Sequence, residues 1–325
     1  MKRKQEVFYG KVLLFGEYSI LLNSMGLTTP FTHFTGELSF ITEDKYTDYN
    51  LATESNKILR EYAKWLGSHE DRSILSNVLD LEVLNADLSK GLYFESNIPQ
   101  GYGIGSSGAL VAALYQQYAF DRIPATARIS KEQTKHLLAV FSAMEGYFHG
   151  TSSGIDPLNC YLHNSLLIKP GKDISVTSIP RNNFYREGAV FLIDTGVVGK
   201  TGPLVSQFLK KMKDKTYENL IQKTYIPMVN NCINHILNSN LAEFGKELVN
   251  LSRFQLRNFE EMIPDSFRNI WELGLDENLF QVKLCGSGGG GFLLGFTSDF
   301  NKTLKFFEQR KIAVFPVSRT VDLNE

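Results

Sequence analysis

The sequence predicts a globular protein that combines strands and helices, in one large or two medium domains. Three observations lead to this prediction. The 325 residues are 43% hydrophobic and 21% charged, a composition with ample core. Several short stretches alternate or are apolar in the manner of strands, and several longer stretches carry apolar residues at helical spacing. No internal repeat or low-complexity segment stands out among them.

The charge balance and the cysteines exclude several classes of function. The net charge is -1, so the chain lacks the basic footprint expected of a nucleic-acid-binding protein. Its longest apolar runs are far below the ~20 residues of a membrane span, and its basic start lacks the apolar run of a signal peptide. The cysteines Cys160, Cys232 and Cys285 have no metal or redox spacing and suit a reducing cytosol. We therefore expect a cytoplasmic protein without nucleic-acid or membrane partners.

The N-terminal part of the chain predicts several strands and one helix. Residues 7–22 alternate and then become apolar, which predicts a strand, a turn at Gly16-Glu17 and a second strand. Residues 28–41 predict a strand pair, and residues 50–65 predict a helix. Residues 81–88 and 91–94 predict two further strands, which lead into a glycine-rich loop.

The glycine-rich loop, within residues 97–108, joins a strand to a helix that starts at Ser106. Either Ser106 or Ser107 is expected to cap that helix. Loop glycines allow positive φ and a close approach to a ligand, and the helix dipole adds attraction for an anion such as phosphate. A strand-to-helix turn whose glycines serve packing alone is the alternative. The loop glycines are Gly101, Gly103 and Gly105.

Charged residues in apolar surroundings mark a second group of candidates. Lys11 lies in a strand between glycine and apolar residues and needs a partner there. A helix that starts at Ser130 with a capping box carries Glu145 beside its apolar stripe. Glu145 either pairs with His149, four residues on, or binds a cation. A polar turn then delivers Asp156 to the start of an apolar stretch, where it is either a turn aspartate or a functional carboxylate.

The C-terminal half predicts alternating strands and helices. Residues 189–194 form a strand, and the stretches 204–212, 225–237 and 241–251 carry apolar stripes at helical spacing. Residues 281–296 contain a glycine-rich loop between two strands. A glycine-rich hairpin that binds nothing is the alternative to a ligand-binding loop here.

Together these motifs resemble those of the GHMP kinases, in the same order along nearly the whole chain. P-x-G-x-G-x-G-S-S-x-A, from Pro99, closely resembles the central motif of that family. The strand with Gly10-Lys11 followed by G-E-Y resembles the first motif, and K-L-C-G-S-G-G-G-G, from Lys283, resembles the third. The pattern E-x-x-x-H-G-x-x-S-G-x-D from Glu145 to Asp156 is similar to that of mevalonate kinases.

The resemblance implies an α+β fold of two domains, with ATP and substrate in the cleft between them. The N-terminal GHMP kinase domain, residues 1–187, would be ribosomal-protein-S5-like α/β and would contain the phosphate loop at 97–108. The C-terminal GHMP kinase domain, residues 188–325, would be ferredoxin-like α+β and would contain the glycine-rich loop at 285–291. The cofactors implied are ATP and Mg²⁺.

The resemblance also assigns roles to individual residues. Asp156 would be the catalytic base and Lys11 its catalytic partner, while Glu145 and the hydroxyl of Ser107 would hold Mg²⁺. The residues that would bind the cofactor are Gly101, Gly103, Gly105, Ser106, Ser107, Gly108, Gly286, Ser287 and Gly288. Those that would contact the substrate are Lys11, Glu17, Tyr18, Asp156 and Thr201.

The implied activity is ATP-dependent phosphorylation of a small-molecule hydroxyl, with mevalonate converted to 5-phosphomevalonate as the first choice. The segments expected around the acceptor offer only Lys11 and Lys200 as cations, enough for one carboxylate and few for an added phosphate. G-E-Y in place of G-E-H is more typical of phosphomevalonate kinases, which remain an alternative with other small-molecule GHMP kinases. A non-catalytic sensor of ATP and ligand is an alternative of another class. A homodimer is one open option for the oligomeric state.

Overall fold

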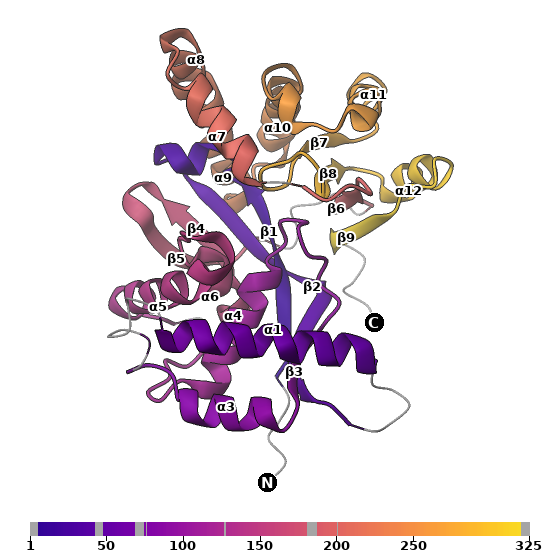
Figure 1. Ribbon diagram of the computed structural model, residues 1–325. Helices are drawn as coiled ribbons and strands as arrows, with labels where there is room; N and C mark the ends of the chain where they lie inside the picture. Colours follow the sequence, from indigo (N-terminus) through magenta and orange to yellow (C-terminus); the bar gives the residue numbers. More distant parts are fainter. Residues whose placement is uncertain are drawn as a thin grey trace. The chain divides into compact units, whose positions relative to one another are not determined.

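The computed structural model describes residues 6–42, 48–68, 75, 77–126, 128–180, 187–199 and 201–319. The chain divides into two compact units (Figure 1). The first unit contains residues 1–11, 30–99 and 105–164, and the second contains residues 12–29, 100–104 and 165–325. The second unit therefore takes in segments that the sequence placed in the N-terminal domain. A division of the family's domains at residues 187 and 188, and a cleft between them, stay predictions.

Two long strands run from one unit into the other. β1 (Phe8–Phe15) starts in the first unit, and β2 (Gly26–Phe40) starts in the second. The start of β2 pairs antiparallel with β4 (Ser165–Lys169), and its end pairs antiparallel with β3 (Leu92–Ser96). β5 (Asp173–Thr177) pairs with β4, so the first sheet has the order β1-β2-β4-β5 with β3 also on β2.

Helices form the rest of the first unit. α1 and α3 pack on β3, while α4, α5 and α6 pack on one another. The rings of Tyr115, Phe141 and Tyr161 form the centre of that second group, with centroids 5.1 to 5.6 Å apart. The helices are α1 (Tyr49–Ser68), α3 (Leu81–Ser89), α4 (Ser106–Tyr118), α5 (Lys131–His149) and α6 (Ile155–Leu162).

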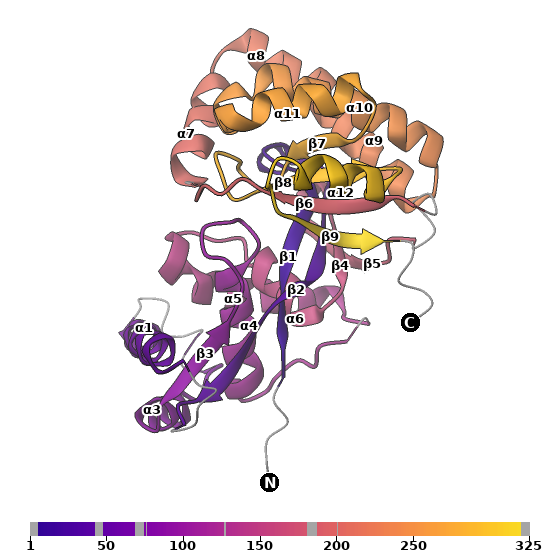
Figure 2. The ribbon, with the colours of Figure 1, turned by 90° about the vertical axis from the view of Figure 1, so that its right-hand side faces the viewer.

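The second unit is built on a four-stranded antiparallel sheet with the order β7-β8-β6-β9. One β-α-β unit, a hairpin and a second helix lead from β6 to β9, which is the ferredoxin-like arrangement that the resemblance implied. Helices α10 and α11 pack against β7 (Figure 2). The strands are β6 (Ala189–Asp194), β7 (Gln281–Leu284), β8 (Phe292–Thr297) and β9 (Val314–Arg319).

The helices of the second unit are mostly amphipathic, and their apolar faces supply its core. Fully buried Trp271, Phe191 and Phe280 belong to that core. The α-helices are α7 (Thr201–Lys211), α8 (Lys215–Leu220), α9 (Ile226–Leu237), α10 (Leu241–Asn258), α11 (Asp265–Asp276) and α12 (Phe300–Glu308). The shorter turns are η1 (Ser19–Leu22), η2 (Pro170–Lys172), the π-helical η4 (Ile221–Tyr225) and η5 (Glu260–Met262). In the described part of the chain, no helix is long and apolar enough to cross a membrane.

Most of the predicted elements are confirmed, but three of the N-terminal strands were wrong. Residues 81–88 form helix α3, because Asp80 caps the N–H of Val83 and Leu84 and Leu88 are buried at helical spacing. The predicted second strand before residue 22 is the 3₁₀ turn η1. The predicted pair at 28–41 is the single 15-residue strand β2.

The two predicted helix caps had different outcomes. The capping box at Ser130 is confirmed: the N–H of Gln133 donates to Ser130 Oγ at 3.2 Å, and the N–H of Ser130 donates to Gln133 Oε1 at 2.9 Å. At α4 the N-cap is Gly105, with φ of 79°, so the cap expected at Ser106 or Ser107 was wrong. Because Gly105 has no side chain, the N-cap residue supplies no side-chain acceptor for the first N–H groups of α4.

Candidate functional site

A lysine–carboxylate pair lies at the start of helix α6 in the first unit. Asp156 is the second residue of α6, whose N-cap Gly154 has a φ of 72°. The Nζ of Lys11, on β1, lies 2.9 Å from Asp156 Oδ2. The Lys11 side chain is 7% exposed and that of Asp156 is 42% exposed. The partner expected for Lys11 is therefore this carboxylate, which still reaches solvent.

Two glycines of the central motif bring helix α4 against this pair. A Cβ at Gly105 would lie 2.9 Å from Lys11 Cγ, and a Cβ at Gly108 would lie 2.9 Å from the carbonyl carbon of Asp156. Either side chain would force something to move, so glycine is required for the close packing of α4 on α6. The start of α4, with its N–H groups and dipole, therefore lies beside the Lys11–Asp156 pair.

Glu145 lies close by on helix α5 and is almost completely buried. Ser107 Oγ donates to Glu145 Oε1 at 3.0 Å, and Ser152 Oγ donates to Oε2 in a short hydrogen bond. Burial, followed by the charge of Asp156, raises the pKa of Glu145 to about 7, although the two serines and Lys11 act in the opposite direction.

His149 contacts the same serine and does not pair with Glu145. Its Nε2 lies 3.0 Å from Ser107 Oγ. The serine hydroxyl has a single proton, so if Ser107 donates to Glu145, His149 donates to Ser107. Among the ion pairs of the described residues, none joins Glu145 to His149. The helix-face pair that the sequence left open is thus replaced by a shared contact with Ser107.

The oxygen atoms around Glu145 suit a hard divalent cation. Magnesium prefers oxygen ligands and is held by one or two carboxylates together with phosphates and waters. Glu145 and Ser107 supply such oxygens, and a buried carboxylate with a raised pKa would be stabilised by a cation. Across the described ranges, no group of three or more His, Cys, Asp and Glu residues could hold a metal alone. The donors present therefore fit an ion that also binds phosphate.

The second unit gathers three loops, two of which carry predicted cofactor-binding residues. The loop segment 100–104 contacts the turn 195–199, where the N–H of Gly199 donates to the carbonyl of Gly101 at 3.3 Å. It also contacts the glycine-rich loop 285–291: the Tyr102 and Phe292 rings are 4.9 Å apart, and a Cβ at Gly291 would lie 2.8 Å from Tyr102 Cα. Gly101, Gly103 and the predicted glycines 286 and 288 thus lie on neighbouring loops.

The loop 285–291 is fixed by backbone hydrogen bonds at its C-terminal end. The N–H of Gly289 donates to the carbonyl of Met262 at 2.6 Å, and the N–H of Gly291 donates to that of Val197 at 2.5 Å. The glycines of this loop adopt positive φ, which a side chain would strain. These hydrogen bonds and backbone angles therefore define the conformation of the loop.

Glu17 and Tyr18 have partners inside the second unit. Glu17 forms an ion pair with Lys283, and both side chains are 0% exposed. The hydroxyl of Tyr18, which is 4% exposed, donates to the carbonyl of Ser287 at 2.6 Å. These contacts give no support to the substrate-binding role that the resemblance assigned to Glu17 and Tyr18, and that role stays a prediction.

Sequence reasoning missed Lys283 as a functional candidate, although a signal was present. Lys283 lies between Val282 and Leu284 in an apolar strand, which is the same pattern that singled out Lys11. A buried lysine needs a partner, and the partner here is Glu17, 266 residues away in the sequence. Thr201, the remaining predicted substrate contact, is the first residue of α7. Lys200, named only as a cation expected around the acceptor, lies outside the described residues.

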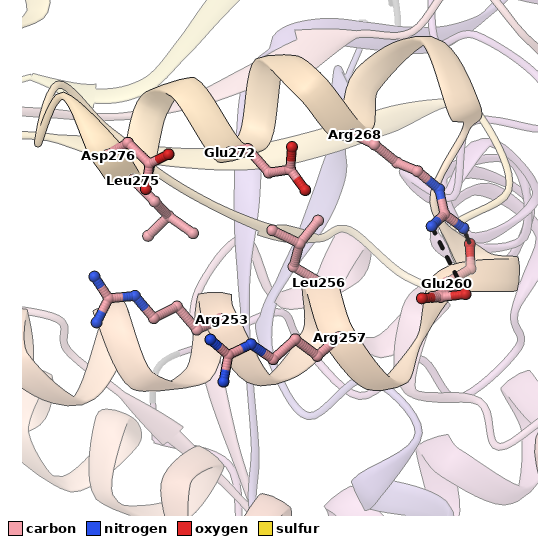
Figure 3. Close-up of a pocket in the computed structure, with 8 residues that line it drawn as sticks. All are labelled: Arg253, Leu256, Arg257, Glu260, Arg268, Glu272, Leu275 and Asp276. Carbon is pink, nitrogen blue, oxygen red and sulfur yellow. Dashed lines mark hydrogen bonds and ion pairs between the residues drawn. The ribbon is translucent and has the colours of Figure 1, made fainter.

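A groove between helices α10 and α11 has a volume of about 360 Å³ and contains none of the predicted site residues (Figure 3). Arg253 and Arg257 extend from α10, and Glu272 and Asp276 extend from α11. Arg268 closes one end through Glu260, with a guanidinium-to-carboxylate distance of 3.8 Å. The arginines at 253 and 257 thus line a groove that also carries carboxylates.

Comparisons with known proteins agree with this architecture. A model of the family described as "GHMP kinases N terminal domain" matches residues 74–163. No curated protein matches the chain by sequence. The α+β fold with two sheets is confirmed by solved structures that match nearly the whole chain, and at their identities of under 25% the likeness establishes the fold alone.

Three of these structures are two mevalonate kinases and one phosphomevalonate kinase. Mevalonate kinase from Methanococcus jannaschii has a TM-score of 0.65 and 18% identity, over 96% of this chain and 97% of that chain. Mevalonate kinase from L. major in complex with R-mevalonate has a TM-score of 0.64 and 16% identity, over 97% and 95%. Phosphomevalonate kinase from Streptococcus pneumoniae has a TM-score of 0.62 and 14% identity, over 96% and 98%.

Proposed function

Because the chain belongs to the GHMP kinase superfamily, a family of ATP-dependent small-molecule kinases, we propose that it transfers the terminal phosphoryl group of ATP to the hydroxyl of a small molecule. One observation carries this proposal: the half-exposed Asp156 pairs with Lys11 directly beside the start of helix α4. A carboxylate, a cation and a helix N-terminus are groups that can position and stabilise phosphoryl transfer to an alcohol.

Each member of this group has a defined task in the proposed reaction. Asp156 accepts the proton of the substrate hydroxyl as the oxygen attacks phosphorus. Lys11 holds the Asp156 carboxylate in place through their ion pair, and it stabilises the negative charge that develops on the transferring phosphoryl group. The N–H groups at the start of α4 bind phosphate oxygens.

We propose that Glu145 and Ser107 hold Mg²⁺ on the phosphates. The ion would neutralise phosphate charge and orient the terminal phosphoryl group. An activity titration with Mg²⁺, run on the wild type and on Glu145→Gln, tests this assignment. We expect the variant to need more Mg²⁺ for half-maximal activity, and superimposable curves would remove Glu145 from the metal site.

Within this class, mevalonate is the substrate that we propose, with 5-phosphomevalonate as product. The uninterrupted pattern from Glu145 to Asp156 supports it. The two cations expected around the acceptor also support it, because Lys11 already pairs with Asp156 and Lys200 lies outside the described residues. Arg253 and Arg257 line a groove with carboxylates of their own. An added phosphate on the substrate would need several such cations.

A phosphomevalonate kinase is the second candidate, and the sequence Gly16-Glu17-Tyr18 favours it. The decisive measurement is kcat/KM for mevalonate and for 5-phosphomevalonate, both at saturating MgATP. We expect mevalonate to be the faster substrate. A clear preference for 5-phosphomevalonate, or no activity on either compound, would overturn the assignment.

A sensor that binds ATP and ligand without turnover is separated from an enzyme by product formation. Steady-state release of ADP, measured with a panel of small alcohols, gives turnover for an enzyme and none for a sensor. Asp156→Asn is the matched control, because it keeps the shape of the side chain and removes the proton acceptor.

A further inference from the structure

The turn that contains Tyr18 is strained. Tyr18 has φ of 60° and ψ of -43°, and the N–H of Ser19 donates to the carbonyl of Glu17 at 2.6 Å. This is a γ-turn with positive φ at its centre, a rare conformation that is costly for a residue with a large side chain. Such strain persists only where the surrounding structure enforces it.

Buried side chains of the second unit enforce this turn from both sides. The Glu17 carboxylate pairs with Lys283, which also donates to the carbonyl of Leu284 at 2.6 Å. The hydroxyl of Tyr225 donates to the carbonyl of Glu17 at 2.9 Å, and Gln255 Nε2 donates to that hydroxyl at 2.9 Å. The acceptor of the γ-turn is thus held by a network that reaches from α10 to β7.

The strained turn presents the Tyr18 hydroxyl to the glycine-rich loop. Its ring packs against Phe208 and Phe259, with centroids 4.7 and 5.5 Å away, and its hydroxyl reaches the carbonyl of Ser287. Burial raises the pKa of Tyr18 far above its ordinary value, so the hydroxyl keeps the proton that it donates.

This hydroxyl forms one of the attachments of the loop 285–291. Gly289 and Gly291 anchor the C-terminal end through Met262 and Val197. Residues 286–288, where the cofactor contacts are expected, are bonded to Tyr18 through the carbonyl of Ser287. The peptide planes next to that carbonyl set the directions of the neighbouring N–H groups, so the phenol of Tyr18 controls which way they point.

We propose that Tyr18, Glu17 and Lys283 are positioning residues that hold residues 286–288 in the conformation that binds the nucleotide phosphates. The inference rests on the proposed function. It assigns Glu17 and Tyr18 to the nucleotide side of the reaction instead of the substrate side. The enclosed Glu17–Lys283 pair fixes the turn, and Tyr18 transmits that fixed geometry to the loop.

The test is Tyr18→Phe, with Tyr217→Phe as the matched control. Tyr217 also packs on Phe208, and within the described chain its buried hydroxyl has no hydrogen-bond partner, so its removal should leave nucleotide binding unchanged. Losing one hydrogen bond to the loop should raise the Kd for MgADP, measured by calorimetry, and the KM for MgATP by about three- to tenfold. The KM for the alcohol should stay unchanged.

The outcomes separate this inference from the proposed function. If the wild type binds no MgADP and turns over no alcohol, the proposed function fails. If the wild type binds MgADP and Tyr18→Phe binds it equally well, the positioning role fails. A rise confined to the KM for the alcohol would return Tyr18 to the substrate side and also overturn the inference.

A second variant tests the ion pair without leaving a buried charge. The double substitution Glu17→Leu with Lys283→Met replaces both partners by apolar side chains of similar length, which buried pairs often tolerate. We expect a folded protein by circular dichroism with an MgADP Kd raised at least threefold. A folded double variant with wild-type MgADP affinity and wild-type KM values would show that the pair is structural alone.

Discussion

Two lysines of the described chain are buried and paired with carboxylates, yet the two pairs differ in access to solvent. The Lys283–Glu17 pair is completely enclosed, whereas the Lys11–Asp156 pair leaves 42% of the Asp156 side chain exposed. The atoms of an enclosed pair are not accessible to a solute, so the two charges have a structural role. A half-open pair keeps one carboxylate oxygen available for a reaction. We therefore expect the same residue types to support structure in one unit and, under the proposed function, chemistry in the other.

The largest expected effect comes from removing the open carboxylate. Asp156→Asn should fold and bind MgATP, because Asn has nearly the same shape and Asp156 is half-exposed. Its kcat should fall by about 10²- to 10⁴-fold, the usual contribution of a positioned base. Initial rates at saturating MgATP, with MgADP affinity as the check on folding, measure this. Near-normal turnover would remove Asp156 from the mechanism.

Breaking the enclosed pair should affect stability more than chemistry. Lys283→Met leaves the Glu17 carboxylate buried without its ion-pair partner, which should cost about 3–5 kcal/mol of unfolding free energy. The matched control is Lys211→Met, since the Lys211–Glu261 pair is about one-third exposed on both sides and should contribute less than about 1 kcal/mol. Urea denaturation of the three proteins gives the comparison. Equal losses for the two variants would contradict the distinction between enclosed and open pairs.

The two pairs also show which contacts can be predicted from the sequence and which cannot. Lys11 and Asp156 stood out because each lies in a local pattern, and the capping box and the glycine loops are local patterns too. The Glu17–Lys283 pair joins residues 266 positions apart, and no spacing in the sequence encodes such a contact. The link from Ser107 to Glu145 and His149 likewise depends on how α4 packs on α5.

The wrong predictions have two different causes, one local and one tertiary. Residues 81–88 contain apolar residues that fit either the strand or the helix period, and the cap at Asp80 decides for a helix. The turn at Tyr18 could not be foreseen, because tyrosine is not a residue type that favours positive φ. In that turn, tertiary contacts hold the Tyr18 backbone in a conformation that its residue type disfavours. The turn belongs to the motif that contacts the glycine-rich loop.

A smaller effect is expected from Glu145, a buried carboxylate that has serine partners and forms no ion pair with a lysine among the described residues. Its pKa of about 7 in the folded protein exceeds the ordinary value of 4.5. The folded state therefore holds the proton more tightly than the unfolded state, and the associated stability is fully present below pH 4.5 and is lost as pH rises through about 7. The loss amounts to roughly 3 kcal/mol.

Glu145→Gln removes this titration, so the wild type should lose stability relative to the variant between pH 4.5 and pH 8. Unfolding free energies of both proteins, measured in urea without nucleotide or Mg²⁺ across that range, test the sign and the size. Parallel pH profiles would mean that Glu145 is ionised throughout and that its hydrogen bonds outweigh its burial.

The smallest expected effect comes from a substitution that should move Asp156, the carboxylate of the half-open pair, without changing any charge. Gly108→Ala would place a Cβ 2.9 Å from the carbonyl carbon of Asp156, so α4 and α6 must separate slightly. This overpacking should cost about 1–3 kcal/mol. Gly245→Ala is the matched control: it is also helical, nothing lies within 4 Å of its Cβ position, and it should gain up to about 1 kcal/mol.

Gly108→Ala should also lower kcat, because the shift moves Asp156 relative to Lys11, and Gly245→Ala should not. Unchanged kcat in a destabilised Gly108→Ala would show that the reaction tolerates movement of α6, and that the closeness of the two helices serves stability alone.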